Sequence, residues 1–290
     1  YAFWMNGEKD LENGSSIKRV VKTVDGDILN RYFDEANEPR PDSYLIDIED
    51  SENANEEFFR NIRSACESGW DFSSRWFADG DTIQTIETLN LAQVDLNSLL
   101  WHLENTLAKS SSLQNLSEKE KYYSERATSR KQMIDKYFWD ENSGRYKDYH
   151  TKKNIKTSSE HIAALYPLFL GLASEDQARS VANNIEEKFL YQGGLVTTTK
   201  NSGQQWDFPN AWAPYQWLGF KSMKNYGFND LAEKIKSNWS SNVERVYRNT
   251  GKLMEKYNAL DIETVAGGGE YPNQDGFGWT NGVYLKLKRN

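Results

Sequence analysis

The strongest constraint on the fold is a succession of amphipathic helices joined by short polar connectors. Apolar residues recur every three or four positions, a spacing that places them on one face of a helix. Seven segments are expected to be helical: 56–68, 94–109, 117–139, 159–172, 174–190, 211–226 and 229–248. Consecutive helices with short links pack as antiparallel hairpins, and no alternating strand pattern separates these segments. The sequence therefore predicts an all-α fold.

Start and stop signals support several of these boundaries. Ser117 and Glu120 have the spacing of a capping box, and Ser174 opens another N-terminal signature. Gly69 is expected to end the helix before it. The first 50 residues are expected to be irregular, apart from a short strand at 18–24 that a turn follows.

Charge and composition exclude several classes of function. The formal net charge is −8, and an acidic surface disfavours nucleic acid as a partner. No apolar run approaches the roughly 18 to 20 residues that a membrane span needs. The single cysteine, Cys66, permits no intrachain disulfide, and the three histidines show no metal-ligand spacing. We therefore expect no histidine metal site and no membrane span.

Three connecting segments combine aromatic residues, glycines and carboxylates: 68–76, 203–214 and 267–281. Ten tryptophans and sixteen tyrosines are many for a chain of 290 residues. They suit packing in a large helical core, and they also suit stacking against the apolar faces of sugar rings. Loops of this composition on a rigid scaffold indicate a functional site.

The carboxylates in these loops fit glycoside hydrolysis, which needs a protonated carboxyl and an ionised one. Asp71 lies between Trp70 and Phe72, and an apolar setting favours the protonated form of an acid. A helix-capping role for Asp71 remains open. For the second carboxylate, Glu255 and Glu270 are both candidates.

Local chemistry favours Glu270 as the second carboxylate, because three glycines before it let the backbone approach a ligand closely. Glu255 could instead pair only with Lys252 or Lys256, and Glu270 could only satisfy amide groups of its loop.

Other polar residues are candidates for holding sugar hydroxyls. Arg40, Asp42 and Arg75 could form paired hydrogen bonds, although ordinary salt bridges are the alternative. A stacking and hydrogen-bonding wall is expected from four residues of the segment 203–214, Trp206, Asp207, Asn210 and Trp212.

Longer motifs resemble those of the trehalases of glycoside hydrolase family 37. The segment 204–214 (QQWDFPNAWAP) is similar to the second signature of that family, and 67–76 (ESGWDFSSRW) to the segment holding its general acid. The segment 267–282 is similar to the glycine-rich C-terminal signature, and 31–32 and 40–43 fit as well. Order and spacing agree from about residue 2 to residue 287, nearly the whole chain.

The resemblance implies a six-hairpin α/α toroid that hydrolyses trehalose to two glucose molecules with inversion. By position, Asp71 would be the general acid and Glu255 the general base, against the local preference for Glu270. Glu270 would contact the substrate instead. Further substrate contacts would come from Arg40, Asp42, the backbone at Gly69 and Trp206. No metal or cofactor is implied.

The sequence departs from the family pattern at several points. Position 42 is Asp where Glu is usual, the glycine run is three residues long, and Asn258 stands where Asp is common. The first signature of the family and the sugar-binding residues upstream are missing. Residues 1–290 are therefore expected to form one partial catalytic domain, about the second half of the toroid plus an irregular N-terminal segment. The missing N-terminal part is then an expected partner.

Two other functions remain open. The chain could belong to a related α/α-toroid glucosidase that acts on another disaccharide, or be a truncated, non-catalytic chain that binds trehalose. A periplasmic or secreted location is favoured over a cytoplasmic one.

Overall fold

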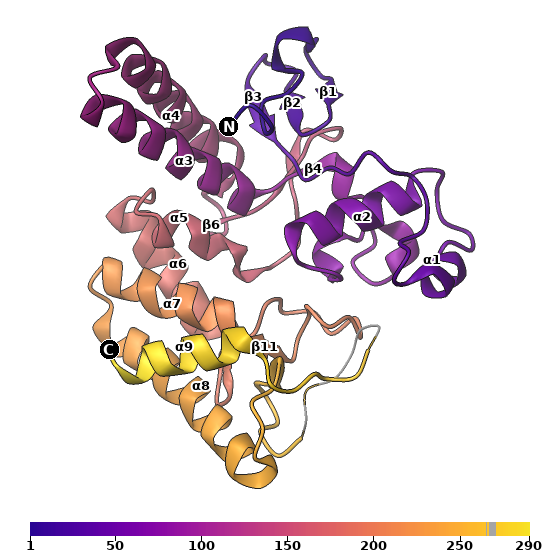
Figure 1. The fold of residues 1–290 in the computed structure, drawn as a ribbon, viewed down its shortest axis with the longest axis vertical. Helices are drawn as coiled ribbons and strands as arrows, with labels where there is room; N and C mark the ends of the chain where they lie inside the picture. The colour runs from indigo at the N-terminus through magenta and orange to yellow at the C-terminus, as the bar shows by residue number, and fades with distance from the viewer. Residues whose placement is uncertain (265, 267–270) are drawn as a thin grey trace. The chain divides into compact units, whose positions relative to one another are not determined.

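Helices dominate the structure, a computed structural model that describes residues 1–264, 266 and 271–290 (Figure 1). The described residues form two compact units. Unit 1 comprises Tyr1–Gly69 and Gln84–Ser158, and unit 2 comprises Trp70–Ile83 and Ser159–Asn290. The expectation of one partial domain over residues 1–290 stays a prediction.

Unit 1 is built on a long helical hairpin. Its helices are α1 (Tyr44–Asp50), α2 (Phe58–Ser68), α3 (Val94–Leu113) and α4 (Ser117–Tyr137), with 3-10 turns η1 (Glu8–Asp10) and η4 (Thr88–Asn90). A further 3-10 turn, η3 (Ile83–Thr85), lies at the boundary. α3 and α4 pack side by side (Figure 1), joined by a turn in which Asn115 has a φ of 57°. Asparagine tolerates this left-handed conformation better than most residues do.

Short antiparallel ribbons accompany the helices of unit 1. The first sheet has the order β1 (Ser16–Ile17), β2 (Val20–Lys22) and β3 (Ile28–Asn30). A second contains β4 (Leu91–Ala92), β7 (Tyr149–His150) and β8 (Ile155–Lys156), and a third pairs β5 (Trp139–Asp140) with β6 (Arg145–Tyr146). The strand expected at 18–24 is confirmed by β2, and the turn after it by Gly26, which has a φ of 90°.

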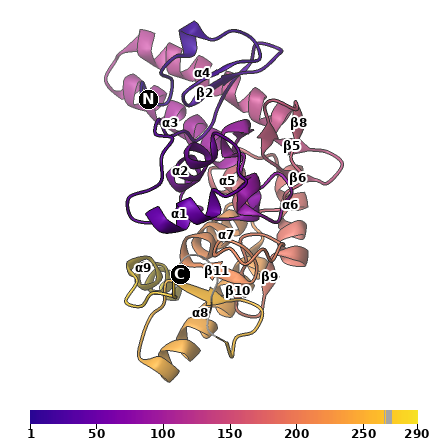
Figure 2. The ribbon, with the colours of Figure 1, turned by 90° about the vertical axis from the view of Figure 1, so that its right-hand side faces the viewer.

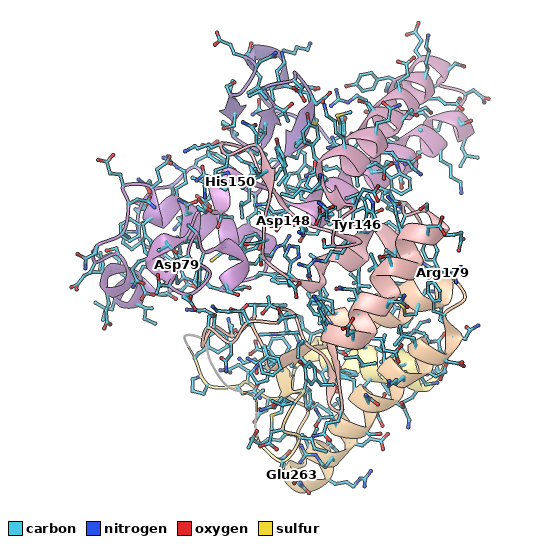
Figure 3. The ribbon with its side chains drawn as sticks, turned by 180° about the vertical axis from the view of Figure 1, so that it is seen from behind. Asp79, Tyr146, Asp148, His150, Arg179 and Glu263 are labelled. Carbon is cyan, nitrogen blue, oxygen red and sulfur yellow. The ribbon has the colours of Figure 1, made fainter. Side chains whose placement is uncertain are left out.

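Asp148 fixes the start of α3 from a distant part of the chain. Its side chain is fully buried, and its Oδ1 accepts a hydrogen bond of 2.9 Å from the backbone N–H of Val94. The first N–H groups of a helix have no partner within the helix, so this carboxylate supplies one. Figure 3 shows Asp148 beside Tyr146 and His150, along the segment that carries β6 and β7.

A buried ion pair ties α3 to α4. The Glu104 carboxylate accepts hydrogen bonds of 2.9–3.0 Å from Nε and Nη2 of Arg130, and one of 2.9 Å from the Tyr1 hydroxyl. Arg130 Nη1 also donates to the side-chain oxygens of Asn30 and Asn97. Both charged side chains are almost completely buried, so each depends on the other for charge compensation.

Glu104→Ala is therefore expected to lower the free energy of unfolding by about 3–5 kcal/mol, because it leaves the Arg130 charge buried without its partner. Urea denaturation measures this loss. Glu125→Ala is the matched control, since Glu125 on α4 forms only an exposed pair with Lys121. Equal losses in the two variants would contradict a stabilising role for the buried pair.

Unit 2 contains the remaining helices. They are α5 (Tyr166–Phe169), α6 (Glu175–Lys188), α7 (Ala213–Asn225), α8 (Asn229–Thr250) and α9 (Gly278–Lys288), with 3-10 turns η2 (Ser74–Trp76) and η5 (Ile162–Leu165). α7 packs against both α8 and α9 (Figure 2). Two ribbons pair β9 (Leu190–Tyr191) with β10 (Gly194–Leu195), and β11 (Asn210–Trp212) with β12 (Lys256–Asn258).

Close packing around α7 requires glycine at position 219. A Cβ added there would lie 2.4 Å from Cδ1 of Leu195 and 3.5 Å from Cδ1 of Ile235. Those two side chains, like Phe220 and Trp239, are buried in the core of unit 2. The missing side chain of Gly219 thus lets α7 approach both β10 and α8.

Most predicted helices are confirmed, with three corrections. Segment 159–172 is not a continuous helix. Its first residues are extended, and they are followed by η5 and by the single turn of α5, which contains Pro167. The capping box at Ser174 is confirmed, whereas the one at Ser117 is wrong, because Ser117 is already helical and Leu116 is the N-cap. α1 and α9 lie in segments expected to be irregular or loop.

None of the helices that the structure describes is both long enough and apolar enough to cross a membrane.

Candidate active site

Two antiparallel strands of unit 2 bring Glu255 next to the tryptophan-rich segment. In the pair β11–β12, Trp212 lies opposite Lys256 and Asn210 opposite Asn258. Glu255 directly precedes β12, so it lies at the end of the pair beside Trp212. Strand pairing thus joins two loops that the sequence separates by more than 40 residues.

The Glu255 carboxylate is held on both oxygens. Lys256 Nζ lies 3.0 Å from its Oε2, and the Tyr271 hydroxyl donates a hydrogen bond of 3.1 Å to its Oε1. The main chain is fixed as well, by hydrogen bonds with the Gln274 carbonyl (2.9 Å) and the Trp279 indole N–H (3.0 Å). Only 5% of the Glu255 side chain is exposed. The geometry therefore presents a rigid, buried carboxylate.

Lys256 is the cation that compensates Glu255. Its side chain is fully buried, its Nζ donates to Gln205 Oε1 at 3.2 Å, and it lies 5.2 Å from the centre of the Trp212 ring. Of the two lysines considered as partners of Glu255, Lys252 bonds Asp275 instead. Glu255 and Lys256 therefore compensate each other's charge as a buried ion pair, and further hydrogen bonds satisfy their remaining polar atoms.

Asp71 lies in the same unit and is flanked in sequence by Trp70 and Phe72, both of which are buried. Asp71 itself is half-buried. The N-cap of the 3-10 turn that follows is Ser73, whose side chain accepts the Arg75 N–H, so Asp71 does not occupy this capping position. The main-chain carbonyl of Asp71 accepts a hydrogen bond of 2.5 Å from Gln205 Nε2.

Asp207 anchors the segment after Asp71. Its buried carboxylate accepts hydrogen bonds from the Ser73 hydroxyl (2.6 Å), the Ser74 N–H (2.8 Å), the Thr198 hydroxyl (2.9 Å) and the Ser202 hydroxyl. Burial raises the pKa of Asp207 above its ordinary value, while the hydrogen bonds from Ser202 and Ser73 oppose that rise. These contacts are with protein groups, so Asp207 shapes the loop that carries Asp71.

Asp207→Asn is expected to lower the free energy of unfolding by about 1–3 kcal/mol, because an amide cannot accept all four hydrogen bonds. A raised folded-state pKa means that the native protein binds the proton more tightly than the unfolded chain. Protonation of Asp207 therefore stabilises the folded state. This contribution to the free energy of unfolding is fully present below about pH 4, the ordinary pKa of Asp, and is lost as pH rises through the folded-state pKa. The substitution should remove this pH dependence.

Urea denaturation of wild type and Asp207→Asn between about pH 3.5 and pH 7 measures both effects. Asp230→Asn is the matched control, because Asp230 is exposed in the first turn of α8. The stability advantage of wild type over Asp207→Asn should shrink as pH rises. A difference in the free energy of unfolding that grows with pH would contradict a raised pKa for Asp207.

Tyr271 lies within the influence of both candidate carboxylates. Burial, together with the charges of Glu255 and Asp71, raises the pKa of Tyr271 to about 12, while a hydrogen bond with Gln205 opposes the rise. Tyr271 therefore keeps its proton at neutral pH and remains a donor to Glu255. Tyr271 thus interacts with Glu255, Gln205 and Asp71, and these four residues form one site in unit 2.

A cluster of aromatic rings surrounds this site. Trp206 stacks on Trp212 with ring centres 3.9 Å apart and an interplanar angle of 3°, and on Trp70 at 5.6 Å and 15°. The Trp279 ring meets Trp206 and Trp212 edge-on, and the Trp70 indole N–H donates to the Tyr215 hydroxyl. Trp206 is only 5% exposed, so the predicted stacking wall is itself part of a packed aromatic core.

The other predicted substrate contacts are distributed differently. Arg40 and Asp42 belong to unit 1, where buried Arg40 forms a bidentate pair with Asp47 of α1 and Asp42 is exposed. Gly69 ends α2 with a φ of 82°, and its N–H bonds the Cys66 carbonyl. Their proposed contacts with substrate stay predictions.

Two further residues were predicted to contact the substrate, Arg75 and Glu270. Arg75 is buried in unit 2, with its guanidinium over the rings of Trp70 (4.8 Å) and Trp76 (4.5 Å). Glu270 lies outside the described residues.

Sequence reasoning missed three residues of the site: Gln205, Tyr271, and Lys256 in its role as a partner of both Gln205 and Glu255. The available signal was their place in the sequence: Gln205 and Tyr271 lie within two aromatic segments, beside Trp206 and Glu270, and Lys256 directly follows Glu255. Within residues 1–264, 266 and 271–290, no group of three or more His, Cys, Asp or Glu side chains is arranged to hold a metal ion.

A helical scaffold whose loops gather two carboxylates and stacked tryptophans is the arrangement of the α/α-toroid class of glycoside hydrolases. The sequence model of the trehalase family matches residues 1–289. The chain belongs to the trehalase family.

Individual relatives agree with this assignment. The chain is 44% identical over 291 residues to a periplasmic trehalase of Salmonella paratyphi B, covering 99% of this chain and 51% of the relative. The solved neutral trehalase Nth1 from Saccharomyces cerevisiae superposes with a TM-score of 0.74 at 25% identity, covering 97% of this chain and 55% of that protein. The predicted all-α, α/α-toroid fold class is confirmed by this likeness.

A more distant likeness concerns the fold alone. A GH63 mannosylglycerate hydrolase from Thermus thermophilus superposes with a TM-score of 0.53 at 21% identity, covering 68% of this chain and 47% of that protein. The chain spans about half the length of the curated relatives that it matches.

Proposed function

We propose that this chain carries the acid and the base of an enzyme that hydrolyses α,α-trehalose to two glucose molecules. Family membership and the names of the relatives support the substrate. The observation that carries the chemistry is a set of contacts that joins the two residues: Gln205 bonds the main chain of Asp71 at 2.5 Å and Lys256 at 3.2 Å, and Lys256 lies 3.0 Å from Glu255. Two carboxylates in one aromatic-lined site are the groups that glycoside hydrolysis requires.

The proposed reaction proceeds with inversion. Glu255 accepts a proton from a water molecule, whose oxygen bonds to the anomeric carbon of one glucose. Asp71 donates its proton to the glycosidic oxygen, and the bond between that oxygen and the anomeric carbon breaks. The attacked ring leaves as β-glucose and the other as α-glucose.

The environments of the two carboxylates support this division of roles. Glu255 Oε2 lies 3.0 Å from the Lys256 ammonium, and a general base needs a carboxylate held in a fixed place to take a proton from water. Asp71 is flanked in sequence by Trp70 and Phe72, both of which are buried, and Gln205 holds its main-chain carbonyl, so the residue proposed as the acid has a fixed backbone. Arg40, Asp42, Gly69, Trp206 and Glu270 are proposed to contact the sugars.

Glucose release from trehalose tests the proposal. The 290-residue chain is assayed alone and after fusion to the N-terminal segment of a periplasmic trehalase relative. Activity in either form, with equal early yields of α- and β-glucose, supports the proposal. Turnover of maltose or kojibiose in preference to trehalose would indicate the related glucosidase. Trehalose binding without turnover in either form would indicate a non-catalytic chain.

We further propose that the protein works in the periplasm, as the names of its curated relatives suggest. Fractionation of cells that produce the natural protein, with a cytoplasmic marker enzyme as the control, tests the location.

A further inference from the structure

We propose that Gln205 and Lys256 form a positioning bridge that fixes the general acid relative to the general base. This inference rests on the proposed function and adds two residues that act through Asp71 and Glu255. The bridge runs from the main chain of Asp71 through the Gln205 amide and the Lys256 ammonium to the Glu255 carboxylate.

The acid side of the bridge holds the backbone that carries Asp71. Gln205 Nε2 donates to the Asp71 carbonyl at 2.5 Å, and the next residue, Trp206, donates its N–H to the Phe72 carbonyl at 3.1 Å. Gln205 is 1% exposed. Water therefore has little access to replace this hydrogen bond, and the position of Asp71 depends on the glutamine.

The base side uses the other end of the same amide. Gln205 Oε1 accepts from Lys256 Nζ at 3.2 Å, and the same nitrogen reaches Glu255 Oε2 at 3.0 Å. The Lys256 ammonium also lies near the faces of the Trp212 ring (5.2 Å) and the Tyr271 ring (4.9 Å). These contacts give the ammonium a defined place between the amide and the carboxylate.

The amide of Gln205 makes this connection because its nitrogen donates to the Asp71 carbonyl while its oxygen accepts from Lys256. Inside a buried network, hydrogen bonds reinforce one another, and losing one partner leaves the others unsatisfied. Catalytic groups displaced by about 1 Å can lose about 100-fold in rate. The bridge is therefore expected to act on turnover more than on substrate binding.

Two substrates separate a positioning role from general damage. Trehalose has a sugar leaving group that needs protonation by the acid, whereas the fluoride of α-glucosyl fluoride leaves without it. Gln205→Met removes the bond to Asp71 and also the bond from Lys256, but Lys256 keeps its own contact with Glu255. The substitution should therefore lower kcat for trehalose about 100-fold, but kcat for α-glucosyl fluoride less than about threefold. Lys256→Met acts on the base and should lower both about equally, by about 100-fold.

Gln216→Met is the matched control. Gln216 is fully buried and, among the described residues, its side chain bonds main-chain groups of Leu195 and Trp212, so the same substitution there should leave the ratio of the two activities unchanged. Circular dichroism and thermal melting check folding. If Gln205→Met does not fold, Gln205→Asn replaces it, because its shorter side chain cannot reach both partners.

All variants are made in whichever form, the chain alone or the fusion, releases glucose from trehalose. Selective loss of trehalose turnover in Gln205→Met, with KM within about twofold, supports the bridge. Equal loss of both activities in Gln205→Met, or full retention of both, would overturn it. A lack of activity in both unsubstituted forms would overturn the proposed function, and the bridge with it, before any substitution is compared.

Discussion

Asp71→Asn is expected to lower kcat for trehalose about 1,000-fold, because the amide has no proton to give to the departing sugar. The substitution keeps the size of the side chain, and it leaves the main-chain carbonyl that Gln205 holds unchanged. The KM for trehalose should therefore change little. The turnover of α-glucosyl fluoride should fall far less than that of trehalose, since fluoride leaves without a general acid.

Asp79→Asn provides a control between the same two helices, α2 and α3. Asp79 is exposed and accepts hydrogen bonds from the N–H groups of Asp81 and Thr82, outside the aromatic cluster. Steady-state kinetics on both substrates compare the two variants. If Asp71→Asn hydrolysed trehalose at close to the wild-type rate, another residue would be the acid.

Glu255→Ala is expected to lower kcat about 1,000-fold for both substrates, because each requires a base to activate water. The variant also leaves Lys256 without its carboxylate, so its melting temperature should fall. Azide needs no deprotonation, and it can bond to the anomeric carbon of α-glucosyl fluoride as fluoride departs. Added azide should therefore restore turnover and give β-glucosyl azide, a result that loss of folding would not produce.

The configuration of the azide product tests inversion against retention, and a second variant tests Glu270 against Glu255 as the base. α-Glucosyl azide would indicate retention of configuration and would overturn the inverting mechanism. Glu270→Gln is the competing variant, because the local sequence favours Glu270 as the second carboxylate. Loss of trehalose turnover in Glu270→Gln, together with an active Glu255→Gln variant, would reassign the base.

Much of the helical framework could be predicted because helix formation depends on local patterns. The apolar spacing in α2, α3 and α8 shows which face is buried, and Gly69 and Ser174 mark ends through their own backbone preferences. Segment 159–172 was predicted wrongly for a related reason. Its run of apolar residues reports burial, and burial alone does not distinguish a helix from an extended segment with a short 3-10 turn.

The sequence predicted the residue types of the candidate site better than it predicted which of those residues hydrogen-bond to one another. Asp71, Glu255 and the tryptophans stand out as acids and aromatic rings in unusual loops, and the family motifs assign them roles. The sequence did not reveal that Gln205 contacts the main chain of Asp71, or that Tyr271 donates to Glu255. These partners lie far apart in the chain, and neither periodicity nor composition pairs them.

The sequence by itself determined the all-α class, the family and the two carboxylates that we propose as acid and base. These features are local, since they depend on residue type and on spacing within short segments. Only the tertiary structure decided that β11 pairs with β12 with Trp212 opposite Lys256, and therefore that a buried lysine joins Glu255 to Gln205. Strand register and side-chain partners arise from contacts between distant segments, where packing and charge compensation select one arrangement among many.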